Sequence, residues 1–419
     1  MRIIRVKNPD SFSRKSSAPL SKKPVQDILE QVRKGGDAAL RRLEKKFGGA
    51  DIKSFLVSKR EIAEAYDKVT KEQLDAIKTA RSNLAKTEAA MKKRLAEVQV
   101  RANGVCIAKS FEPLKTVGCY VPGGLAQYPS SAIMSIVPAK VAGVKKIVVV
   151  TPPNKQGKIS PAVLVAADVC GADAIFKVGG AHAIAAFAFG TRSIPAVDKI
   201  VGPGGSFVTA AKYLVSDIVS IDMLAGPTEL AIIADDSADP ELVAADLISQ
   251  SEHSPDTTCC LITTSSRLAG AVNKEVQNRI STIKRKEIVR SSLGTNGFIA
   301  LCRNESDMVQ VADNIAPEHL QIIARRQKNI SKMVFSAGLI LVGQNTPSSA
   351  SDYLLGTNHI LPTNRFGRSR GSLSVLDFVK VQTRVESSRA ALQKIDKKIK
   401  ALTESEDLPN HYGAVRARL

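Results

Sequence analysis

Short apolar runs alternate with helical stretches through the middle of the chain. Between residues 113 and 225, each run rich in apolar residues ends in glycine or proline, and a stretch with helical spacing of its apolar residues follows. Repeated strand–turn–helix units of this kind predict a parallel sheet with helices on its faces. The expected strands are 116–121, 146–151, 174–178 and 199–201, and the expected helices are 130–142, 161–169, 181–189 and 208–214.

The same alternation returns in residues 226–378, with strands expected at 229–234, 258–263, 297–301, 320–324 and 339–342. Residues 1–112 instead carry apolar residues at three- and four-residue spacing among many charges, and residues 379–419 return to a charged helix and a tail. The pattern therefore predicts an α/β fold with two similar doubly wound, incomplete Rossmann-like lobes and a cleft between them. A helical N-terminal region precedes the lobes, and a helical C-terminal tail follows them.

Glycine-rich turns follow several expected strands of the first lobe, at residues 122–124, 179–180 and 202–205. Parallel sheets bind ligands at the carboxyl ends of their strands, where these turns lie. Glycine lets backbone amides approach an anion, and the start of the next helix favours negative charge. The pattern GxGxxG followed by a ribose-binding acid is absent, and glycine at a strand end is often purely structural. The turns alone therefore indicate only room for a phosphate or carboxylate ligand.

A helix predicted at residues 241–251 places two potential metal ligands on one face. Asp239 and Pro240 mark its start as an N-cap and a first helical proline. Gln250 and His253 are three residues apart at its end, and an amide oxygen with an imidazole can supply two of the ligands that zinc needs. By itself, such a pair is more often part of a solvated helix surface.

Each of the five histidines falls at a predicted helix end or in a predicted loop, a distribution that favours a site over core packing. They are His182, His253, His319, His359 and His411. Glu318 directly precedes His319, and the two can serve as a pair for proton transfer. Asp352 precedes His359 by seven residues, so one loop can offer both to a metal or a substrate. Spacing alone does not decide between a hydrolase and a dehydrogenase.

Composition places the chain among ordinary globular proteins. Its 419 residues are 44% hydrophobic and 24% charged, which suffices for two or three cores. No apolar run is long enough to span a membrane, and the first residues lack the features of a signal peptide. The six cysteines form no CxxC pair, as is typical of reduced thiols. We therefore expect a cytoplasmic protein with no membrane partner.

The net charge of +20 raises the alternative of a nucleic-acid partner. However, aromatic residues make up only 4% of the chain, tryptophan is absent, and the basic residues are scattered over predicted helix surfaces without an RNA-binding motif. A generally basic surface, or attraction to anionic metabolites, is the simpler interpretation. We therefore expect no nucleic-acid partner.

Eight short motifs carry a family likeness. They are GCYVPGG (118–124), VGGA (178–181), DKIVGPG (198–204), AGPTE (225–229), SQSEHSPD (249–256), APEHL (316–320), D…GTNHILPT (352–363) and E…H (406–411). In this order they resemble the histidinol dehydrogenase family, and the resemblance covers about residue 20 to the end of the chain. We found no other family that this set of motifs fits.

The resemblance implies an oxidoreductase that oxidises L-histidinol through L-histidinal to L-histidine with two NAD+, the last step of histidine biosynthesis. It implies one Zn2+ per subunit, held by Gln250, His253, Asp352 and His411. The implied acid/base pair is Glu318 and His319. The implied substrate contacts are Thr228, Gln250, His253, His319, Asp352, His359, Glu406, His411 and Ser130, and the implied cofactor contacts are Tyr120, His182 and Gly205.

The chain departs from the family at two cofactor positions, where His182 stands for a usual Gln and Gly205 for a usual Asn. Asp407 likewise replaces a usual Gly. The family's C-terminal tail crosses into the partner subunit, so the resemblance implies a homodimer with shared active sites. His411 is then expected far from its own chain's site, while five residues converge there: Gln250, His253, Asp352, Glu318 and His319.

Two other functions stay open. The first is a dehydrogenase of the same family that acts on another polar alcohol, although the presence of His359 and Glu406 argues against it. The second, suggested by the charge, is a nucleic-acid-binding protein on an inactive enzyme scaffold. Steeply salt-dependent binding to DNA or RNA would support the second, and zinc-dependent turnover would argue against it.

Overall fold

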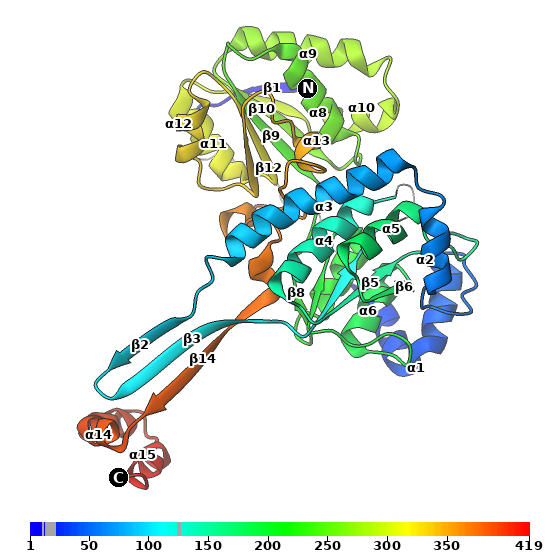
Figure 1. The fold of residues 1–419 in the computed structure, drawn as a ribbon. Helices are drawn as coiled ribbons and strands as arrows, with labels where there is room; N and C mark the ends of the chain where they lie inside the picture. The colour runs from blue at the N-terminus through cyan, green and yellow to red at the C-terminus, as the bar shows by residue number, and fades with distance from the viewer. Residues whose placement is uncertain (11, 13–21, 124–126) are drawn as a thin grey trace.

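The computed structural model describes residues 1–10, 12, 22–123 and 127–419, which form two α/β lobes and a projecting arm (Figure 1). Each lobe contains a parallel sheet covered by helices, so the predicted fold class is confirmed. The arm carries the C-terminus away from both lobes. No helix within these residue ranges is long and apolar enough to cross a membrane.

Five parallel strands form the sheet of the first lobe, in the order β6-β5-β4-β7-β8. Their bounds are β4 Thr116–Tyr120, β5 Lys146–Thr151, β6 Ala174–Lys177, β7 Lys199–Val201 and β8 Ser220–Ile221. The helices of this lobe are α1 Lys23–Phe47, α2 Lys59–Tyr66, α3 Lys71–Lys92, α4 Pro129–Ala142, α5 Pro161–Cys170, α6 Gly180–Phe189 and α7 Ser206–Leu214. Alternate residues of β5 fall into two cores, with Ile147 on the side of α4 and α5 and Val148 on the side of α1 and α6.

Six parallel strands form the sheet of the second lobe, in the order β1-β11-β10-β9-β12-β13. Their bounds are β1 Arg2–Arg5, β9 Glu229–Ala234, β10 Thr258–Thr263, β11 Phe298–Leu301, β12 His319–Ile323 and β13 Leu339–Val342. One face is covered by α8 Pro240–Ser251, α9 Ser266–Ile280 and α10 Lys286–Thr295. The other face is covered by α11 Glu305–Ile315 and α12 Gln327–Met333. The short helix α13, Ser348–Ser351, packs beside α8.

The direction of these elements decides which residues meet. A helix that connects two parallel strands runs antiparallel to them, so the end of α8 lies at the edge where the strands of the second lobe begin. Strands β9 and β12 are neighbours there, with His319 paired to Leu230. The end of α8 and the beginnings of β9 and β12 therefore meet at the amino edge of this sheet. The glycine turns at 179–180 and 202–205 instead lie at the carboxyl edge of their own sheet, and Gly124 of the third predicted turn is outside the described residues.

The arm is a three-stranded antiparallel sheet in the order β14-β3-β2. Its strands are β2 Val98–Ala102, β3 Val105–Pro113 and β14 Val379–Ser387, and α14 Arg389–Ser405 and α15 Pro409–Arg416 form its tip (Figure 1). Asn103 and Gly104 join β2 to β3 with φ of 52° and 81°, as a two-residue hairpin turn requires. Apolar side chains of this sheet are more than half exposed at Val98, Val100, Val381 and Val385.

The structure adds strands to both ends of the chain, where only helix was predicted. The strand β1 joins the second lobe by pairing with β11, and β2, β3 and β14 form the arm. A short edge strand such as β1 has little pattern of its own, because the strand that it pairs with lies far along the chain. His319, expected at a helix start, is instead the first residue of β12, since the apolar residues after it pair with β9 and β13.

Candidate active site

The Glu318 carboxyl lies buried at the amino edge of the second sheet, where it is 7% exposed. Its Oε2 accepts hydrogen bonds from the Thr228 hydroxyl and, at 2.9 Å, from the backbone N–H of Glu229. Burial raises the pKa of Glu318 to about 7, although these hydrogen bonds and the positive charge of His319 act in the opposite direction. A carboxyl with a pKa near neutrality is well suited to accept a proton.

The imidazole of His319 lies between two carboxyl groups. Its Nδ1 is 3.7 Å from Glu318 Oε2 and 3.3 Å from the backbone oxygen of Glu229, and its Nε2 is 3.4 Å from Asp352 Oδ1. Burial favours the neutral ring, but the charges of Glu318 and Asp352 outweigh it and raise the pKa of His319. The ring can therefore hold a proton that it takes from a bound molecule.

Gln250 and Thr228 continue this polar cluster from α8 to β9. The amide nitrogen of Gln250 donates a hydrogen bond to Thr228 Oγ1 at 2.7 Å, and Ser348 of α13 donates to Gln250 Oε1 at 3.3 Å. The Thr228 hydroxyl thus accepts from Gln250 while it donates to Glu318. One short chain of hydrogen bonds therefore fixes the end of α8 to the buried carboxyl.

His253 and Asp352 complete the convergence that the sequence predicts. Although the residue as a whole is exposed, partial desolvation of the ring lowers the pKa of His253 and favours its neutral form, while Asp352 and His319 lie close enough to influence it electrostatically. Burial opposes ionisation of Asp352, yet the neighbouring imidazole of His319 holds the pKa of this carboxyl below its usual range. The structure therefore brings together Gln250, His253, Asp352, Glu318 and His319.

The donors at this edge fit a cation of the zinc type. Within the part of the chain that the structure describes, no group of three or more His, Cys, Asp or Glu side chains is arranged to hold a metal ion. The converging ligands are instead the imidazole of His253, the carboxylate of Asp352 and the amide of Gln250. Asp352 Oδ1 is buried and accepts no hydrogen bond from any described residue, so a cation would satisfy it. Nitrogen and oxygen donors of these types suit zinc, with one ligand still to be supplied.

His359 reaches the site from the segment that returns to the first lobe. Its Nδ1 is 2.8 Å from the backbone oxygen of Asp352, and its Nε2 is 3.4 Å from the hydroxyl of Ser131 on α4. Burial lowers the pKa of His359, which favours the neutral ring. Ser130, half-buried in the first turn of α4, precedes the residue that makes this contact. The first lobe thus borders the site through the start of α4.

The predicted cofactor residues lie apart from this cluster, in the first lobe. Tyr120 is buried, and its hydroxyl accepts a hydrogen bond at 3.1 Å from the backbone N–H of Gly180. His182 is buried in α6, and its Nε2 is 2.8 Å from the Glu44 carboxyl of α1. Gly205, directly before α7, is exposed, and a Cβ placed there would meet no atom within 4 Å. Of the three, Gly205 is therefore the open position.

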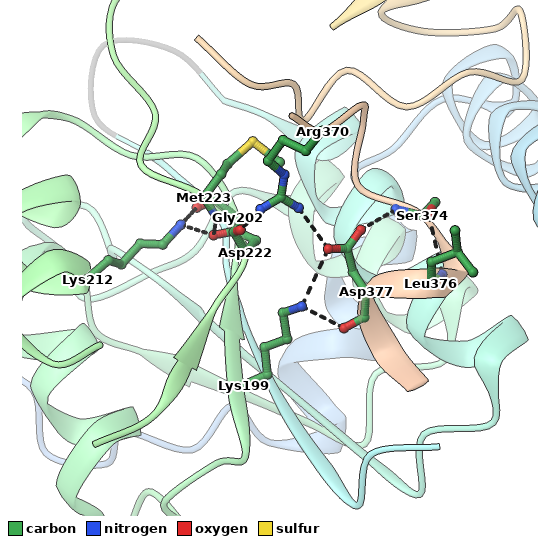
Figure 2. Close-up of polar contacts among 9 residues, drawn as sticks. All are labelled: Lys199, Gly202, Lys212, Asp222, Met223, Arg370, Ser374, Leu376 and Asp377. Carbon is green, nitrogen blue, oxygen red and sulfur yellow. Dashed lines mark hydrogen bonds and ion pairs between the residues drawn. The ribbon is translucent and has the colours of Figure 1, made fainter. Parts of the chain in front are cut away.

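A buried ion pair holds the turn before Gly205 (Figure 2). The Lys212 ammonium pairs with the Asp222 carboxylate and donates to the backbone oxygen of Gly202 at 3.0 Å. The same carboxylate accepts the backbone N–H of Gly202 at 2.8 Å. Arg370 of the returning segment donates to the Asp222 backbone oxygen and, at 2.8 Å, to the Asp377 carboxylate. Both segments that cross between the lobes are thereby joined at this turn.

Two predicted site residues do not join the cluster within one chain. His411 lies in α15 and Glu406 directly follows α14, and both are exposed at the tip of the arm. Figure 1 shows this tip at the opposite end of the molecule from α8, β12 and α13. The expected separation of His411 from its own chain's cluster is therefore confirmed.

Three further residues shape the cluster without a role predicted from the sequence, namely Glu229, Ser131 and Ser348. Glu229 contacts Glu318 and His319, Ser131 contacts His359, and Ser348 contacts Gln250. Only Glu229 carries a signal in the sequence, because it is the one charged residue of an otherwise apolar strand.

Comparisons with known proteins agree with this geometry. The family model described as histidinol dehydrogenase matches residues 13–419. Histidinol dehydrogenase of Bacillus cereus is 43% identical over 394 residues, which cover 94% of this chain and 91% of that protein. The enzyme of Methanococcus maripaludis is 42% identical over 396 residues, which cover 94% and 92%. The crystal structure of histidinol dehydrogenase from Elizabethkingia anophelis superposes with a TM-score of 0.93 at 34% identity, covering 100% of this chain and 98% of that one.

Proposed function

The chain belongs to the histidinol dehydrogenase family and is an NAD-dependent oxidoreductase, and we propose that Glu318 and His319 are the acid/base pair that carries L-histidinol through L-histidinal to L-histidine. The observation that carries this assignment is the buried Glu318 carboxyl, held by Thr228 and Glu229 beside an imidazole. Two oxidations need two proton acceptors with different tasks, and the cluster supplies one of each type.

His319 is the base of the first oxidation. Its imidazole takes the proton of the substrate hydroxyl while the carbon-bound hydrogen leaves as hydride, so the alcohol becomes an aldehyde and one NAD+ is reduced. The imidazolium that results is stabilised by the carboxylates of Asp352, 3.4 Å from Nε2, and of Glu318, 3.7 Å from Nδ1. The proton then passes to solvent before the second step.

Glu318 is the base of the second oxidation. Its carboxylate takes a proton from a water molecule whose oxygen adds to the aldehyde carbon, and this proton returns to the former carbonyl oxygen, which gives the hydrated aldehyde. The hydrate then loses a hydride to the second NAD+ and a proton to Glu318, and it becomes the carboxylic acid of L-histidine. The Thr228 hydroxyl and the Glu229 N–H both bind Oε2, so the other carboxyl oxygen is the one that faces the water.

Gln250, His253 and Asp352, together with His411 of the partner subunit, would hold the zinc ion that the family implies. Bound there, zinc supplies a template that orients the amino and imidazole nitrogens of histidinol. Neutral His253 and ionised Asp352 have the charge states that ligands require. Further substrate contacts are assigned to Ser130, Thr228, His359 and His319, with Glu406 of the partner subunit.

The NAD+ site is assigned to the carboxyl edge of the first lobe. The open position of Gly205 at the start of α7 leaves room for a ligand next to backbone N–H groups. Tyr120 supports the turn at 179–180 by accepting the hydrogen bond from Gly180. His182 supports the same turn indirectly: it contacts Glu44, and Glu44 accepts the N–H of Gly179 at 3.1 Å.

We further propose a homodimer with shared sites in the cytoplasm. The arm projects from both lobes and carries exposed valines, while its tip holds His411 and Glu406 far from their own chain's cluster. Exposed apolar surface on a projecting sheet supports contact with a second copy of the chain. The six cysteines all lie within the described residues and form no disulfide, as is usual in a reducing compartment.

The test is the number of NADH molecules formed per L-histidinol consumed, with zinc, after chelation and after zinc is restored. We expect two NADH per histidinol, lost with the chelator and recovered with zinc. The variant Glu318→Gln is expected to stop after one NADH and to accumulate the aldehyde. Turnover by the chelated enzyme at the full rate, or two NADH from the Glu318→Gln variant, would refute the respective assignment.

A further inference from the structure

Glu229 is a second buried acid next to the catalytic carboxyl, and the mechanism above leaves its side chain without a role. It is the first residue of β9 and is 2% exposed. A buried charged group is expensive unless hydrogen bonds compensate it, so its contacts show what it holds. Every other residue of β9 is apolar and belongs to the packed core of the sheet.

The carboxylate of Glu229 joins two segments that are far apart in sequence. Its Oε2 accepts the backbone N–H of Glu318 at 3.3 Å, and its Oε1 accepts the backbone N–H of Asn364 at 3.1 Å. Its own backbone N–H returns a hydrogen bond of 2.9 Å to Glu318 Oε2. The two glutamates are therefore bonded reciprocally, side chain to backbone in both directions.

The second segment, around Asn364, is the one that returns from the second lobe to the first. Asn364 and Arg365 both have positive φ, 53° and 68°, so the backbone bends sharply where Glu229 holds it. The neighbouring Thr363 accepts the backbone N–H of Gly226 at 2.6 Å, three residues before Glu229. The returning segment and the entry to β9 are thus tied together on both sides of Thr228.

We propose that Glu229 is a positioning residue that fixes the Glu318 carboxylate for the aldehyde step by bonding its backbone to the returning segment at Asn364. This inference rests on the proposed function of Glu318. A carboxylate has two acceptor oxygens, whereas the amide of glutamine has one oxygen and one donor nitrogen. The backbone N–H groups of Glu318 and Asn364 bind different oxygens of Glu229, so this position requires an acid. Charge-assisted bonds of this kind hold backbone more firmly than neutral ones do.

The test compares Glu229→Gln with Glu88→Gln. Glu88 is 5% exposed, and its Oε2 accepts the backbone N–H of Val375 at 2.6 Å, so it is a buried glutamate of the same kind that lies away from the cluster. In Glu229→Gln one oxygen becomes an N–H2 group, and one of the two backbone donors is left facing a donor. We expect kcat for oxidation of L-histidinal to fall about 30- to 100-fold with KM within about threefold, because misplacement of a reacting group costs rate rather than binding.

A pH profile separates positioning from a general loss of structure. The charged groups that face Glu318 are Glu229 from β9 and His319, the first residue of β12. Removing the charge of Glu229 takes away a like charge, so the acid limb of the L-histidinal profile is expected to move to lower pH. Glu88→Gln should leave both the rate and the profile unchanged.

Glu229→Asp is the second variant, for use if Glu229→Gln does not fold. Its shorter carboxylate keeps the charge but can reach only one of the two donors, so we expect a loss of kcat with the acid limb in its original place. Wild-type kcat in Glu229→Gln, or an equal loss in Glu88→Gln, would overturn the inference. Failure of the wild-type and Glu88→Gln enzymes to oxidise L-histidinal would instead refute the proposed function.

Discussion

The carboxyl of Glu318 changes its charge near neutral pH, and this property of one residue predicts how the two oxidations depend on pH. Burial raises the pKa of Glu318 to about 7, and only the ionised form can take a proton from water. Below that pH the carboxyl is protonated and the base is lost. The rate of L-histidinal oxidation is therefore expected to fall about tenfold per pH unit below pH 7 and to be level above it. Steady-state kcat/KM for L-histidinal, measured from pH 5 to pH 9, tests for this decrease on the acid side, the acid limb of the profile.

The control for this limb is the Glu318→Gln variant, whose amide does not titrate. Any residual oxidation of L-histidinal by that variant should lack the limb at pH 7. A limb that persists in Glu318→Gln belongs to another group, such as His319, and would contradict the assignment.

At the residue scale, the sequence predicted the members of the cluster better than their connections. Gln250 and His253 share a helix end, and Glu318 and His319 are adjacent, so spacing marks them as candidates, while the family resemblance implies their roles as metal ligands and as an acid/base pair. The contacts of Glu229 and Ser348 could not be predicted, because they depend on which strands are neighbours and on their register. His319 was expected at a helix start for the same reason, since pairing with β9 and β13 decides its conformation.

At the element scale, the ion pair between α7 and the end of β8 is expected to support the turn at Gly202 (Figure 2). The Lys212 side chain is 2% exposed, and its loss would leave the Asp222 carboxylate buried without its cation. Breaking a buried pair in this way costs about 3–5 kcal/mol. We expect Lys212→Met to lose stability of about that size in urea unfolding and to raise KM for NAD+, since the turn that precedes Gly205 loses a donor.

Lys199 provides the matched control in the same network. It pairs with Asp377 at 3.4 Å, its side chain is 13% exposed, and Arg370 remains bonded to Asp377 when it is removed. Lys199→Met should therefore cost less, about 1 kcal/mol, and leave KM for NAD+ unchanged. Equal losses of unfolding free energy in the two variants would show that burial of the Lys212–Asp222 pair does not increase its contribution to stability.

Most elements of the two lobes could be predicted because their apolar pattern is local. The bounds of β5, β9, β10 and β13 agree with the expected ranges to the residue. The arm was missed although its signals are present. Asn103-Gly104 is a strong hairpin turn, and β14 has valine at alternate positions 379, 381 and 385, separated by polar residues. The many charges around these stretches favour a helical N-terminal region and a charged helix at 387–402, so no strand is predicted there from the sequence.

At the scale of the whole molecule, the arm predicts that two variants that cannot oxidise L-histidinal can restore this activity to each other. His411→Ala removes a residue of the tail, and Glu318→Gln removes one of the cluster. In a dimer with shared sites, a mixed pair has one site with both residues intact. Random mixing gives such pairs in half of the dimers, so co-expression should recover about a quarter of the wild-type rate. The measurement is NADH formed from L-histidinal by the co-expressed dimers, without separation of the mixed pairs.

Mixing Glu318→Gln with His253→Ala is the control, because every site then lacks either the base of the aldehyde step or a zinc ligand of the cluster. That pair should stay inactive. A mixture of His411→Ala and Glu318→Gln that also stays inactive would show that His411 serves no site across the dimer.

At this scale, the apolar pattern predicts the two lobes and their order along the chain, but it does not predict the direction in which the C-terminal tail projects from them. Strand–turn–helix units repeat with local spacing, whereas the position of α14 and α15 depends on β14 pairing with β3, whose residues lie 266 to 282 positions earlier (Val379 with Pro113, Ser387 with Val105). The separation of His411 from the cluster was expected only from the family resemblance.

The site occupies the amino edge of the second sheet, so the opposite edge of that sheet takes no part in the chemistry described above. Residues 343–346 follow β13 at that edge, and Gln344 and Asn345 are exposed there. A short insertion or a fluorescent label at Gln344 is therefore separated from the reacting groups by the length of the strands. This loop offers an attachment point for following the enzyme in cells or fixing it to a surface while its catalytic rate is retained.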